Sequence, residues 1–291
     1  MCAIAIEQKQ YKTYILTNPQ AQSRLEVVPE RGAIITHWSL QQQDILYLDS
    51  DRFADPNLSV RGGIPILFPI CGNLPNNTYT HQGQSYQLKQ HGFARDLPWQ
   101  VIQSSEANHN SESLTLVLNS DDQTRAVYPF DFELAFTYKL IGNALEIHQR
   151  YTNRSDEPMP FSTGLHPYFV TSDKTQLEFE ISASEYQDQI TKAVHPFLDT
   201  FDLSRDELDL AFTQVAEPCA SITDQGRGFK ISLSYSDLYS TLVFWTVKGK
   251  DFYCLEPWTA PRNALNTGEQ LTELAPGESL ETFFTLEVTF L

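Results

Sequence analysis

The stretch FELAFTYKLIGNALEIHQRYT, residues 132–152, contains two segments in which apolar and polar residues alternate. The alternation runs through Phe132–Leu140 and again through Ala144–Thr152, and a period of two is typical of β-strands that bury one face. The connection between the segments contains Gly142, and short glycine-containing connections are common in β-hairpins. The stretch therefore predicts an antiparallel hairpin.

The face of the second segment that carries Leu145, Ile147 and Tyr151 is expected to lie on a core. The best helix candidate is short, LSRDELDLAF at residues 203–212, and no amphipathic helix of three turns is found. Other segments alternate in the same way or are rich in β-branched and aromatic residues: 11–17, 33–40, 113–119, 229–235, 241–247 and 279–290. We therefore expect an all-β protein.

The domain organisation follows from what is missing between these segments. No internal repeat, flexible linker or long block of charge divides the chain. The simplest architecture is a single domain, residues 1–291, folded as one large antiparallel β-sandwich whose loops and groove residues carry the function. Two stacked β domains are the alternative.

Composition and charge narrow the classes of partner. Of the 291 residues 41% are hydrophobic and 20% are charged, as in a globular protein. With 20 Lys and Arg against 37 Asp and Glu, the formal net charge is −17. This charge argues against nucleic acid and acidic membrane surfaces as partners. A small anionic ligand is still allowed, because a local pair of arginines outweighs distant charges within a Debye length of roughly 10 Å.

The cysteines and the N-terminal segment bear on the compartment. Cys2, Cys71, Cys219 and Cys254 are scattered and form no CxxC spacing, so neither a zinc site nor a disulfide framework is predicted. The start MCAIAIEQKQ lacks the features of a signal peptide, and no apolar run approaches the ~20 residues of a membrane span. We expect a cytoplasmic protein without a bound metal.

Four stretches break the strand pattern with dense polar, Gly and Pro content: RGGIPILFPICGN (61–73), HGFARDLPW (91–99), STGLHPYF (162–169) and CLEPWTAPRNALNTG (254–268). Within them, His166 and Glu256 each precede a proline, which favours extended backbone and a fixed side-chain direction. A His and a Glu facing one ligand supply a general acid and a general base. The structural alternatives are a core histidine and a buried ion pair, and His195, which also precedes a proline, is assigned no role.

Other side chains in these stretches suit a polar ligand. Arg61 and Arg95 could hold hydroxyl or phosphate oxygens, unless they are solvated or paired with a carboxylate such as Asp96. His91 could equally be a turn residue packed on Phe93. The aromatic residues that could stack on a sugar ring, or simply belong to the core, are Tyr168, Phe169 and Trp258. Nucleotide-binding, GxSxG and HExxH motifs are absent.

The four stretches, in this order, resemble the galactose mutarotase-like superfamily, which includes aldose 1-epimerases and hexose-6-phosphate 1-epimerases. The resemblance covers essentially the whole chain, and the combination of HGFAR with LHPYF is its most specific part. It implies the β-supersandwich fold, no cofactor, and interconversion of the α and β anomers of a hexose.

The resemblance also implies roles for individual residues. His166 matches the general acid that protonates the ring oxygen, and Glu256 matches the general base that takes the proton from the C1 hydroxyl. His91 matches a hydrogen-bond donor to the substrate. Asp209 looks like the acidic residue that binds sugar hydroxyls, with Asp206 as a rival. For the reaction to run at neutral pH, the base must be charged while the acid carries a transferable proton.

The branch within the superfamily stays open. RGGIPILFP resembles the sugar-phosphate branch, in which arginines such as Arg61 and Arg95 hold a phosphate. The segment that follows resembles the branch acting on unphosphorylated sugars, but relatives there often have Gly-Arg where this chain has Gly72-Asn73. We favour a free aldose, with Asn73 as a substrate-binding candidate, over a hexose 6-phosphate.

Two other kinds of function are alternatives to an epimerase. One is a carbohydrate-binding or sensing protein without turnover, and the other is a glycoside hydrolase that uses Glu256 and Asp209. A matched proton donor and acceptor argues against the first, because binding alone needs neither. The expected partner is a small sugar, and the expected state is a monomer or a weak homodimer.

Overall fold

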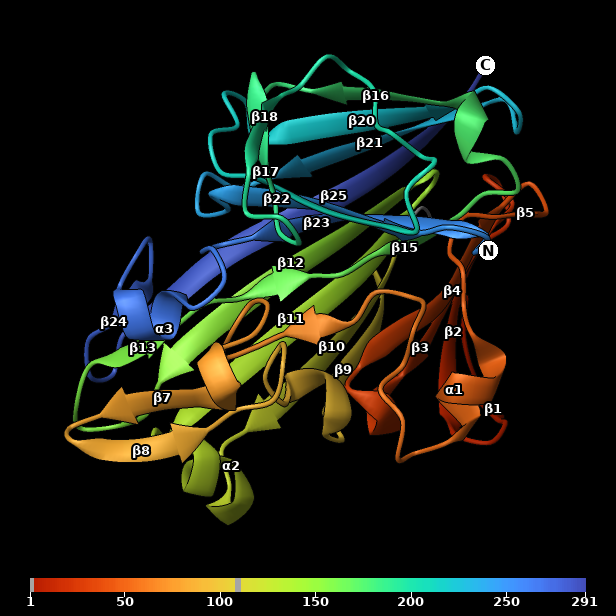
Figure 1. Cartoon of the computed structure of the whole chain (residues 1–291). Helices are drawn as coiled ribbons and strands as arrows, with labels where there is room; N and C mark the ends of the chain where they lie inside the picture. The colour runs from red at the N-terminus through yellow and green to blue at the C-terminus, as the bar shows by residue number, and fades with distance from the viewer. Residues whose placement is uncertain (1–2, 108–110) are drawn as a thin grey trace.

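The computed structural model describes residues 3–107 and 111–291, and antiparallel strands make up most of this part of the chain (Figure 1). The all-β prediction is confirmed. The α-helices within it have at most six residues: α1 (Ser50–Ala54), α2 (Asp122–Val127) and α3 (Ala264–Thr267). Single 3₁₀ turns occur at η1 (Pro29–Arg31), η2 (Pro75–Asn77), η3 (Ala94–Asp96) and η4 (Lys174–Gln176).

The predicted hairpin lies in an eight-stranded sheet of order β16-β20-β21-β25-β12-β11-β10-β9. Its strands are β11 (Phe132–Ile141) and β12 (Ala144–Asn153), and every second residue of β11 is buried, as the alternation predicts. The other strands are β9 (Gln100–Ala107), β10 (Ser111–Asn119), β16 (Leu177–Ile181), β20 (Cys219–Asp224), β21 (Phe229–Tyr235) and β25 (Ser279–Phe290).

A second eight-stranded sheet has the order β18-β17-β19-β22-β23-β14-β6, with β15 also paired to β23. It carries most of the candidate site. Its strands are β6 (Ile66–Leu67), β14 (Gly164–Leu165), β15 (Tyr168–Val170), β17 (Glu185–Asp188), β18 (Val194–Pro196), β19 (Glu207–Phe212), β22 (Thr241–Val247) and β23 (Phe252–Trp258).

Strand β19 corrects the expectation of a helix at residues 203–212. Residues 207–212 are a strand that pairs with β22, and the residues before them form turns and bends. Leu208, Leu210 and Phe212 are buried on one face while Asp209, between them, points to the other. This alternation has the strand period rather than the helix period, and the tertiary pairing decides in its favour.

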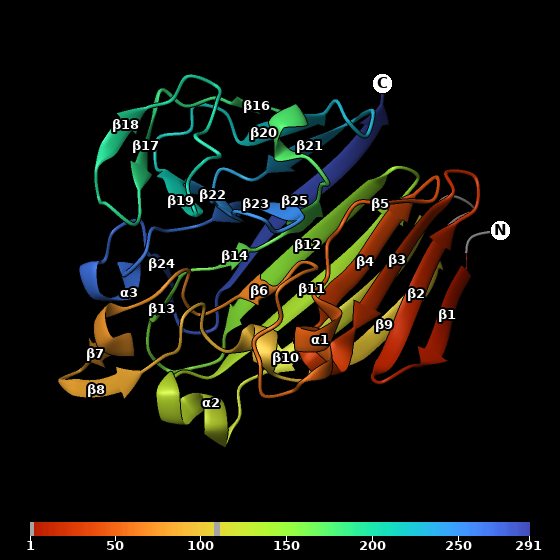
Figure 2. The same cartoon turned by 45° about the vertical axis from the view of Figure 1, so that its right-hand side comes forward.

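A five-stranded sheet, β1-β2-β3-β4-β5, lies beside β9, β10 and β11 (Figure 2). Its strands are β1 (Ala3–Gln8), β2 (Lys12–Asn18), β3 (Ser23–Val28), β4 (Ile34–Leu40) and β5 (Gln43–Asp44). Two small pairs complete the fold: β7 (Thr78–His81) with β8 (Gln84–Gln87), and β13 (Met159–Phe161) with β24 (Thr272–Leu274).

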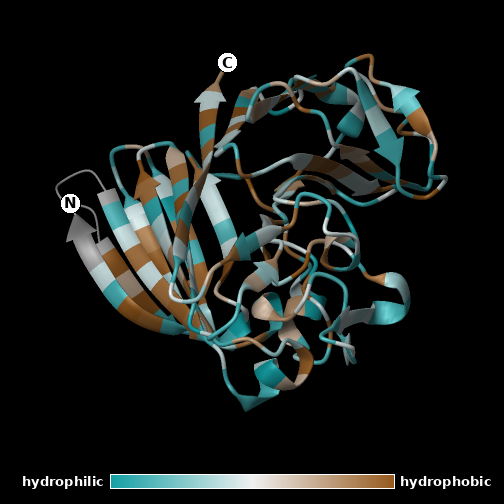
Figure 3. Cartoon of the chain, turned by 90° about the vertical axis from the view of Figure 1, so that its left-hand side faces the viewer, coloured by the Kyte–Doolittle hydropathy of each residue, from teal (hydrophilic) through white to brown (hydrophobic). Residues whose placement is uncertain are grey.

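The main hydrophobic cluster consists of buried side chains from all three large sheets, and its members are spread along the chain between Tyr14 and Val288. The hydropathy colouring shows the reason, because brown and teal alternate along many strands, and each sheet thus has an apolar face to bury (Figure 3). Burial of this kind is the main favourable contribution to folding. Within the described residues, no helix has the length and apolarity that a membrane crossing requires.

Candidate active site

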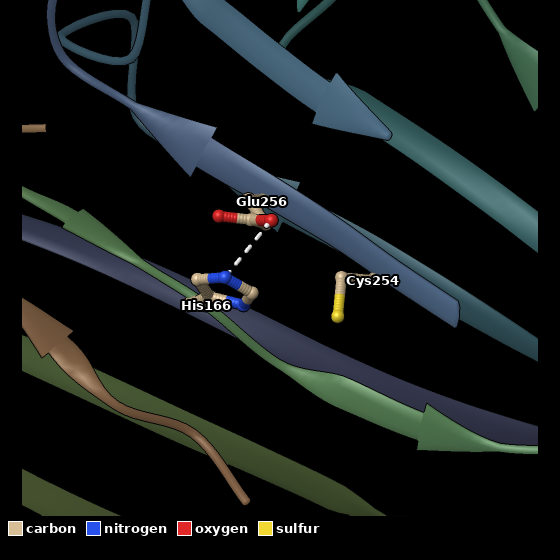
Figure 4. Close-up of side chains that lie close together, drawn as sticks. All are labelled: His166, Cys254 and Glu256. Carbon is tan, nitrogen blue, oxygen red and sulfur yellow. Dashed lines mark ion pairs between the residues drawn. The ribbon is translucent and has the colours of Figure 1, made fainter. Parts of the chain in front are cut away.

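Of the two residues predicted to perform acid–base chemistry, Glu256 lies in β23, and His166 lies between β14 and β15, which both pair with β23. Tyr168 of β15 lies opposite Cys254 of β23, and β14 pairs with β23 in the same register. Two residues along each strand, His166 is therefore opposite Glu256. Opposed residues of an antiparallel pair point to the same face, and Figure 4 shows the two side chains directed at each other.

Prolines interrupt the strand ladder at this point. His166 and Glu256 are each followed by a proline, which has no N–H to donate. The backbone N–H of His166 itself donates to the carbonyl of Pro65, beside β6, at 3.1 Å. Glu256 lies within β23, so the predicted extended backbone before its proline is confirmed.

The acid–base pair is tightly enclosed. Nε2 of His166 lies 3.3 Å from Oε1 of Glu256, and the side chains are only 9% and 2% exposed. The indole N–H of Trp258 donates to Oε2 of Glu256 at 3.1 Å. On the other side, the imidazole stacks on Tyr168 with ring centres 4.6 Å apart and an angle of 7° between the rings. These contacts fix the orientations of both side chains.

Burial moves the two pKa values in directions that favour the uncharged forms. Desolvation raises the pKa of Glu256 well above its ordinary value, and the charge of Asp209 raises it further while Arg262 lowers it. Desolvation lowers the pKa of His166, as does the nearby charge of Arg95. Both shifts favour the form of the pair in which Glu256 carries the proton and both groups are uncharged over the ion-paired form with the proton on His166. The proposed reaction requires the ion-paired form, as expected from the sequence, whereas burial favours the uncharged form.

His91 joins the pair from the loop after β8. Its backbone N–H donates to the carbonyl of Gly72 at 2.7 Å, and its Nδ1 accepts from the N–H of Gly72 at 3.1 Å. With Nδ1 as acceptor, the ring proton is assigned to Nε2. The ring contacts those of His166 and Trp258, at 5.5 and 5.6 Å between centres. Burial lowers the pKa of His91, so the ring is a neutral hydrogen-bond donor.

These groups line a cavity of about 320 Å³, which is the size of a small-molecule site. The lining combines cationic, acidic and aromatic side chains: Arg52, Arg61, Arg95, Arg262, His91, His166, Glu207, Asp209, Glu256, Tyr168, Trp245 and Trp258, together with Ser59, Val60 and Gln90. Such a wall offers both hydrogen-bonding groups for hydroxyls and ring faces for an apolar surface.

The two predicted arginines lie on this wall. Arg61 is exposed, and its guanidinium carbon is 5.9 Å from the centre of the Trp245 ring. Arg95 is half-buried and donates from Nη2 to the carbonyl of Gln90 at 2.9 Å. In the described part of the chain, the arginine ion pairs involve other arginines, so the pairing with Asp96 considered above is not found.

Asp209 reaches the cavity from β19, whereas Asp206, its rival, is exposed outside it. Both carboxylate oxygens of Asp209 accept from Nη2 of Arg262, at 2.9 and 2.7 Å. Asn73 does not line the cavity, and its side-chain oxygen accepts from Nη1 of Arg262 at 3.1 Å. Its predicted role in binding substrate directly therefore has no support from its position, because Arg262 occupies its amide oxygen.

Sequence reasoning missed Arg262, although the residue belongs to the stretch CLEPWTAPRNALNTG. The signal was an arginine between Pro261 and Asn263 in a turn, but nothing in the sequence said where that turn packs. Of the aromatic candidates, Tyr168 and Trp258 line the cavity while Phe169 belongs to the core. Trp245 is a further lining residue that was not predicted.

The donor atoms of His166, Cys254 and Glu256 lie within 4.8 Å of one another, and Figure 4 shows the thiol beside the pair. Among the described residues, these three have donor atoms close enough together to hold a metal ion. Burial raises the pKa of Cys254 well above its ordinary value, which disfavours the thiolate that binds metals. The imidazole and the carboxylate are engaged with each other. The donor set therefore fits a metal poorly.

Comparison with known proteins places the fold and the sequence in one group. A family model described as aldose 1-epimerase matches residues 12–287. The LacX protein encoded on the chromosome of Lactococcus lactis is 25% identical over 251 residues, covering 76% of this chain and 81% of its own. A Salmonella typhimurium protein provisionally named glucose-6-phosphate 1-epimerase is 26% identical, covering 72% of this chain and 66% of its own.

Solved structures agree with the fold. The Slr1438 protein of Synechocystis sp. PCC 6803 is 49% identical, with a TM-score of 0.95 and full coverage of both chains. A galactose mutarotase-like protein of Clostridium acetobutylicum is 18% identical, with a TM-score of 0.83, covering 100% of this chain and 99% of its own. The predicted β-supersandwich is therefore confirmed.

Proposed function

This chain belongs to the aldose 1-epimerase family, and we propose that it is an isomerase that interconverts the α and β anomers of a hexose. The observation that supports this proposal is the pair of His166 and Glu256, directed at each other inside a polar cavity. The ring oxygen and the C1 hydroxyl of a hexose are bonded to the same carbon. An acid and a base whose reacting atoms are 3.3 Å apart can reach both oxygens together.

The reaction starts from the form of the pair in which the proton is on His166. Glu256 takes the proton of the C1 hydroxyl while His166 gives its proton to the ring oxygen, and the C1–O5 bond breaks to leave an open-chain aldehyde. Rotation about C1–C2 presents the other carbonyl face. In closure, His166 takes the proton of the C5 hydroxyl and Glu256 protonates the carbonyl oxygen, so both groups return to their starting states.

The remaining side chains bind and orient the sugar. His91 would donate from Nε2 to the ring oxygen or a hydroxyl, since its Nδ1 is already an acceptor. Asp209 would accept from hydroxyls through lone pairs that Arg262 leaves available. The faces of Tyr168 and Trp245 would cover the apolar side of the ring.

A hexose 6-phosphate is a second candidate substrate, and the arginines of the cavity favour it. Arg52, Arg61 and Arg95 line the cavity, and the ion pairs of the described residues include none of the three. A phosphate would supply the missing negative charge, in the geometry that guanidinium groups prefer. The provisional name of the Salmonella relative points in the same direction.

A glycoside hydrolase is less well supported. It would need a second carboxylic acid free to donate or attack, but Arg262 holds both oxygens of Asp209. A sugar sensor without turnover would not need the buried, costly contact of an imidazole with a carboxylate.

Anomer exchange measured by NMR with D-glucose, D-galactose and D-glucose 6-phosphate in parallel tests the proposal. We expect faster exchange than in buffer for at least one sugar, and no acceleration by the Glu256→Gln variant. A preference for the phosphate of about tenfold or more in kcat/KM would select the second candidate. Binding of a sugar without any acceleration would exclude the epimerase.

A further inference from the structure

Among the arginines that line the cavity, Arg262 is the one that forms an ion pair within the described residues. Its Nη2 bonds both oxygens of Asp209, its Nη1 bonds Asn73, and its guanidinium carbon lies 5.2 Å from the centre of the Trp258 ring. The side chain is 19% exposed and the Asp209 side chain is 17% exposed. Its Nε is buried. Nη1 and Nη2 thus both have hydrogen-bond partners within the protein.

The local backbone is built to receive this side chain. Asn263, next to Arg262, has a left-handed backbone with φ of 67°, and it begins the turn into α3. A Cβ at Gly72 would lie 2.5 Å from Cγ of Arg262 and 3.3 Å from the Trp258 ring. The glycine therefore provides the space in which the arginine lies against the indole, beside the loop that carries Asn73.

The contacts of Arg262 lead to Glu256 by two routes. The first is Trp258, whose face Arg262 covers and whose N–H donates to Oε2 of Glu256. The second is Asp209. Asp209 is paired with Trp245 of β22, and Glu256 is paired with Val243 of the same strand. Residues 243 and 245 are two apart, so the carboxylates of Asp209 and Glu256 project from the same face of the sheet.

The groups that act electrostatically on Glu256 come from every element around it. The charge of Asp209 raises the pKa of Glu256, and the charges of Arg262 and of Arg95 from η3 lower it. His166 is in direct contact. The remaining titratable neighbours are buried: Cys71, Tyr168 and Cys254. Asp209 is the nearby carboxylate that opposes ionisation of Glu256, and Arg262 is its counter-charge.

We propose that Arg262 is a positioning residue for Glu256, acting through Asp209 and Trp258 rather than on the sugar. The proposal rests on the proposed function for its kinetic consequence. With Arg262 in place, the charge of Asp209 is compensated and the indole N–H stays aimed at Oε2 of Glu256. Without it, an uncompensated like charge remains on the same wall as the general base, and the base becomes harder to deprotonate.

The test compares pH profiles of kcat/KM for α-D-glucose among the wild type, Arg262→Gln, Arg262→Lys and the double variant Asp209→Asn/Arg262→Gln. We expect Arg262→Gln to move upward, by about one pH unit, the limb of the profile at which Glu256 loses its proton. Arg262→Lys keeps the charge and should stay close to the wild type. The double variant removes both charges, so this limb should return to its wild-type position, even if the rate of the double variant is lower than that of the wild type.

The protonation of Glu256 can also be measured without turnover. Proteins labelled with ¹³C at the glutamate carboxyl groups are titrated by NMR, and the Glu256 signal is assigned by its loss in Glu256→Gln. The titration midpoint of Glu256 should be higher in Arg262→Gln than in the wild type and in the double variant. If the wild type has no epimerase activity, the proposed function fails while this titration still decides the role of Arg262.

Arg125→Gln is the matched control, since Arg125 also forms ion pairs, with Asp122 and Asp131 on α2 and the segment after it, outside the cavity. It should leave the profile and the midpoint unchanged. A rise in KM for Arg262→Gln with an unmoved limb and midpoint would mean that Arg262 binds the sugar directly and would overturn the proposal. An equal loss of rate at every pH would do the same, by showing a purely structural role. If Arg262→Gln does not fold, Asp209→Asn alone gives the complementary comparison, because loss of that like charge should move the Glu256 midpoint below the wild-type value.

Discussion

Nε2 of His166 lies 3.3 Å from Oε1 of Glu256, although ninety positions separate the two residues in the chain. The contact follows from strand register, because β14 and β15 run along β23 so that the two residues are opposed. The prolines after both residues remove backbone donors at that position. The catalytic proposal depends on this cross-strand pair.

Glu256→Gln should abolish most of the catalysis while keeping the sugar bound. The amide has the shape of the carboxyl group but cannot accept the proton of the C1 hydroxyl, so we expect kcat to fall by roughly 10²–10⁴-fold. Polarimetry of freshly dissolved α-D-glucose gives the rate, and calorimetric titration gives the affinity. A rate equal to that of the wild type would remove Glu256 from the mechanism.

The same variant should change how stability depends on pH. Burial and Asp209 raise the pKa of Glu256 above 4.5 in the folded state, so the folded protein binds this proton more tightly than the unfolded chain does. The contribution is present below the unfolded pKa and is lost as pH rises through the folded pKa. Gln does not titrate, so the Tm of Glu256→Gln relative to the wild type should rise as the pH increases from about 4.5 toward the folded-state pKa of Glu256. A difference that is constant across this range would contradict the direction of the shift.

Arg61→Ala should separate the two candidate substrates. Arg61 is exposed on the cavity wall, with its guanidinium carbon 5.9 Å from the centre of the Trp245 ring, and its charge is only a lesser cause of the lowered pKa of His166. If the substrate is a hexose 6-phosphate, loss of one guanidinium should lower kcat/KM for D-glucose 6-phosphate by about tenfold or more and leave D-glucose within about threefold. Equal effects on both sugars would mean that Arg61 does not bind the phosphate. Arg52→Ala on the same wall provides a parallel comparison.

Gly92→Ala should destabilise the loop that holds His91. Gly92 has φ of +69°, and a Cβ there would lie 2.1 Å from the carbonyl oxygen of Phe68, so the backbone must move. We expect the free energy of unfolding to fall by about 1–3 kcal/mol or more, measured by urea denaturation. Gly142→Ala is the control, because Gly142 also has positive φ but nothing within 4 Å of the added carbon. Equal losses in both variants would show that the conformation, and not the clash, sets the cost.

The sequence by itself determined the class of fold and predicted the two residues for which we propose acid–base roles. Alternation placed β11 and β12 with an error of one residue at one end of each strand, because a half-buried strand needs a period of two whatever it pairs with. It failed at residues 203–212, where Leu208, Leu210 and Phe212 fit a short helix or a strand until the pairing with β22 decides. The order of the motifs, through the resemblance to a family, singled out His166 and Glu256.

Only the tertiary structure decided how the site is assembled. It placed Asp209 in the cavity and Asp206 outside, put Arg262 between Asp209 and Asn73, and left Asn73 off the cavity wall. Local patterns cannot give these results, because they depend on the register between strands far apart in the chain and on the path of a turn across the sheet. The charge around Glu256 is set by such long-range neighbours, so its protonation is a property of the fold.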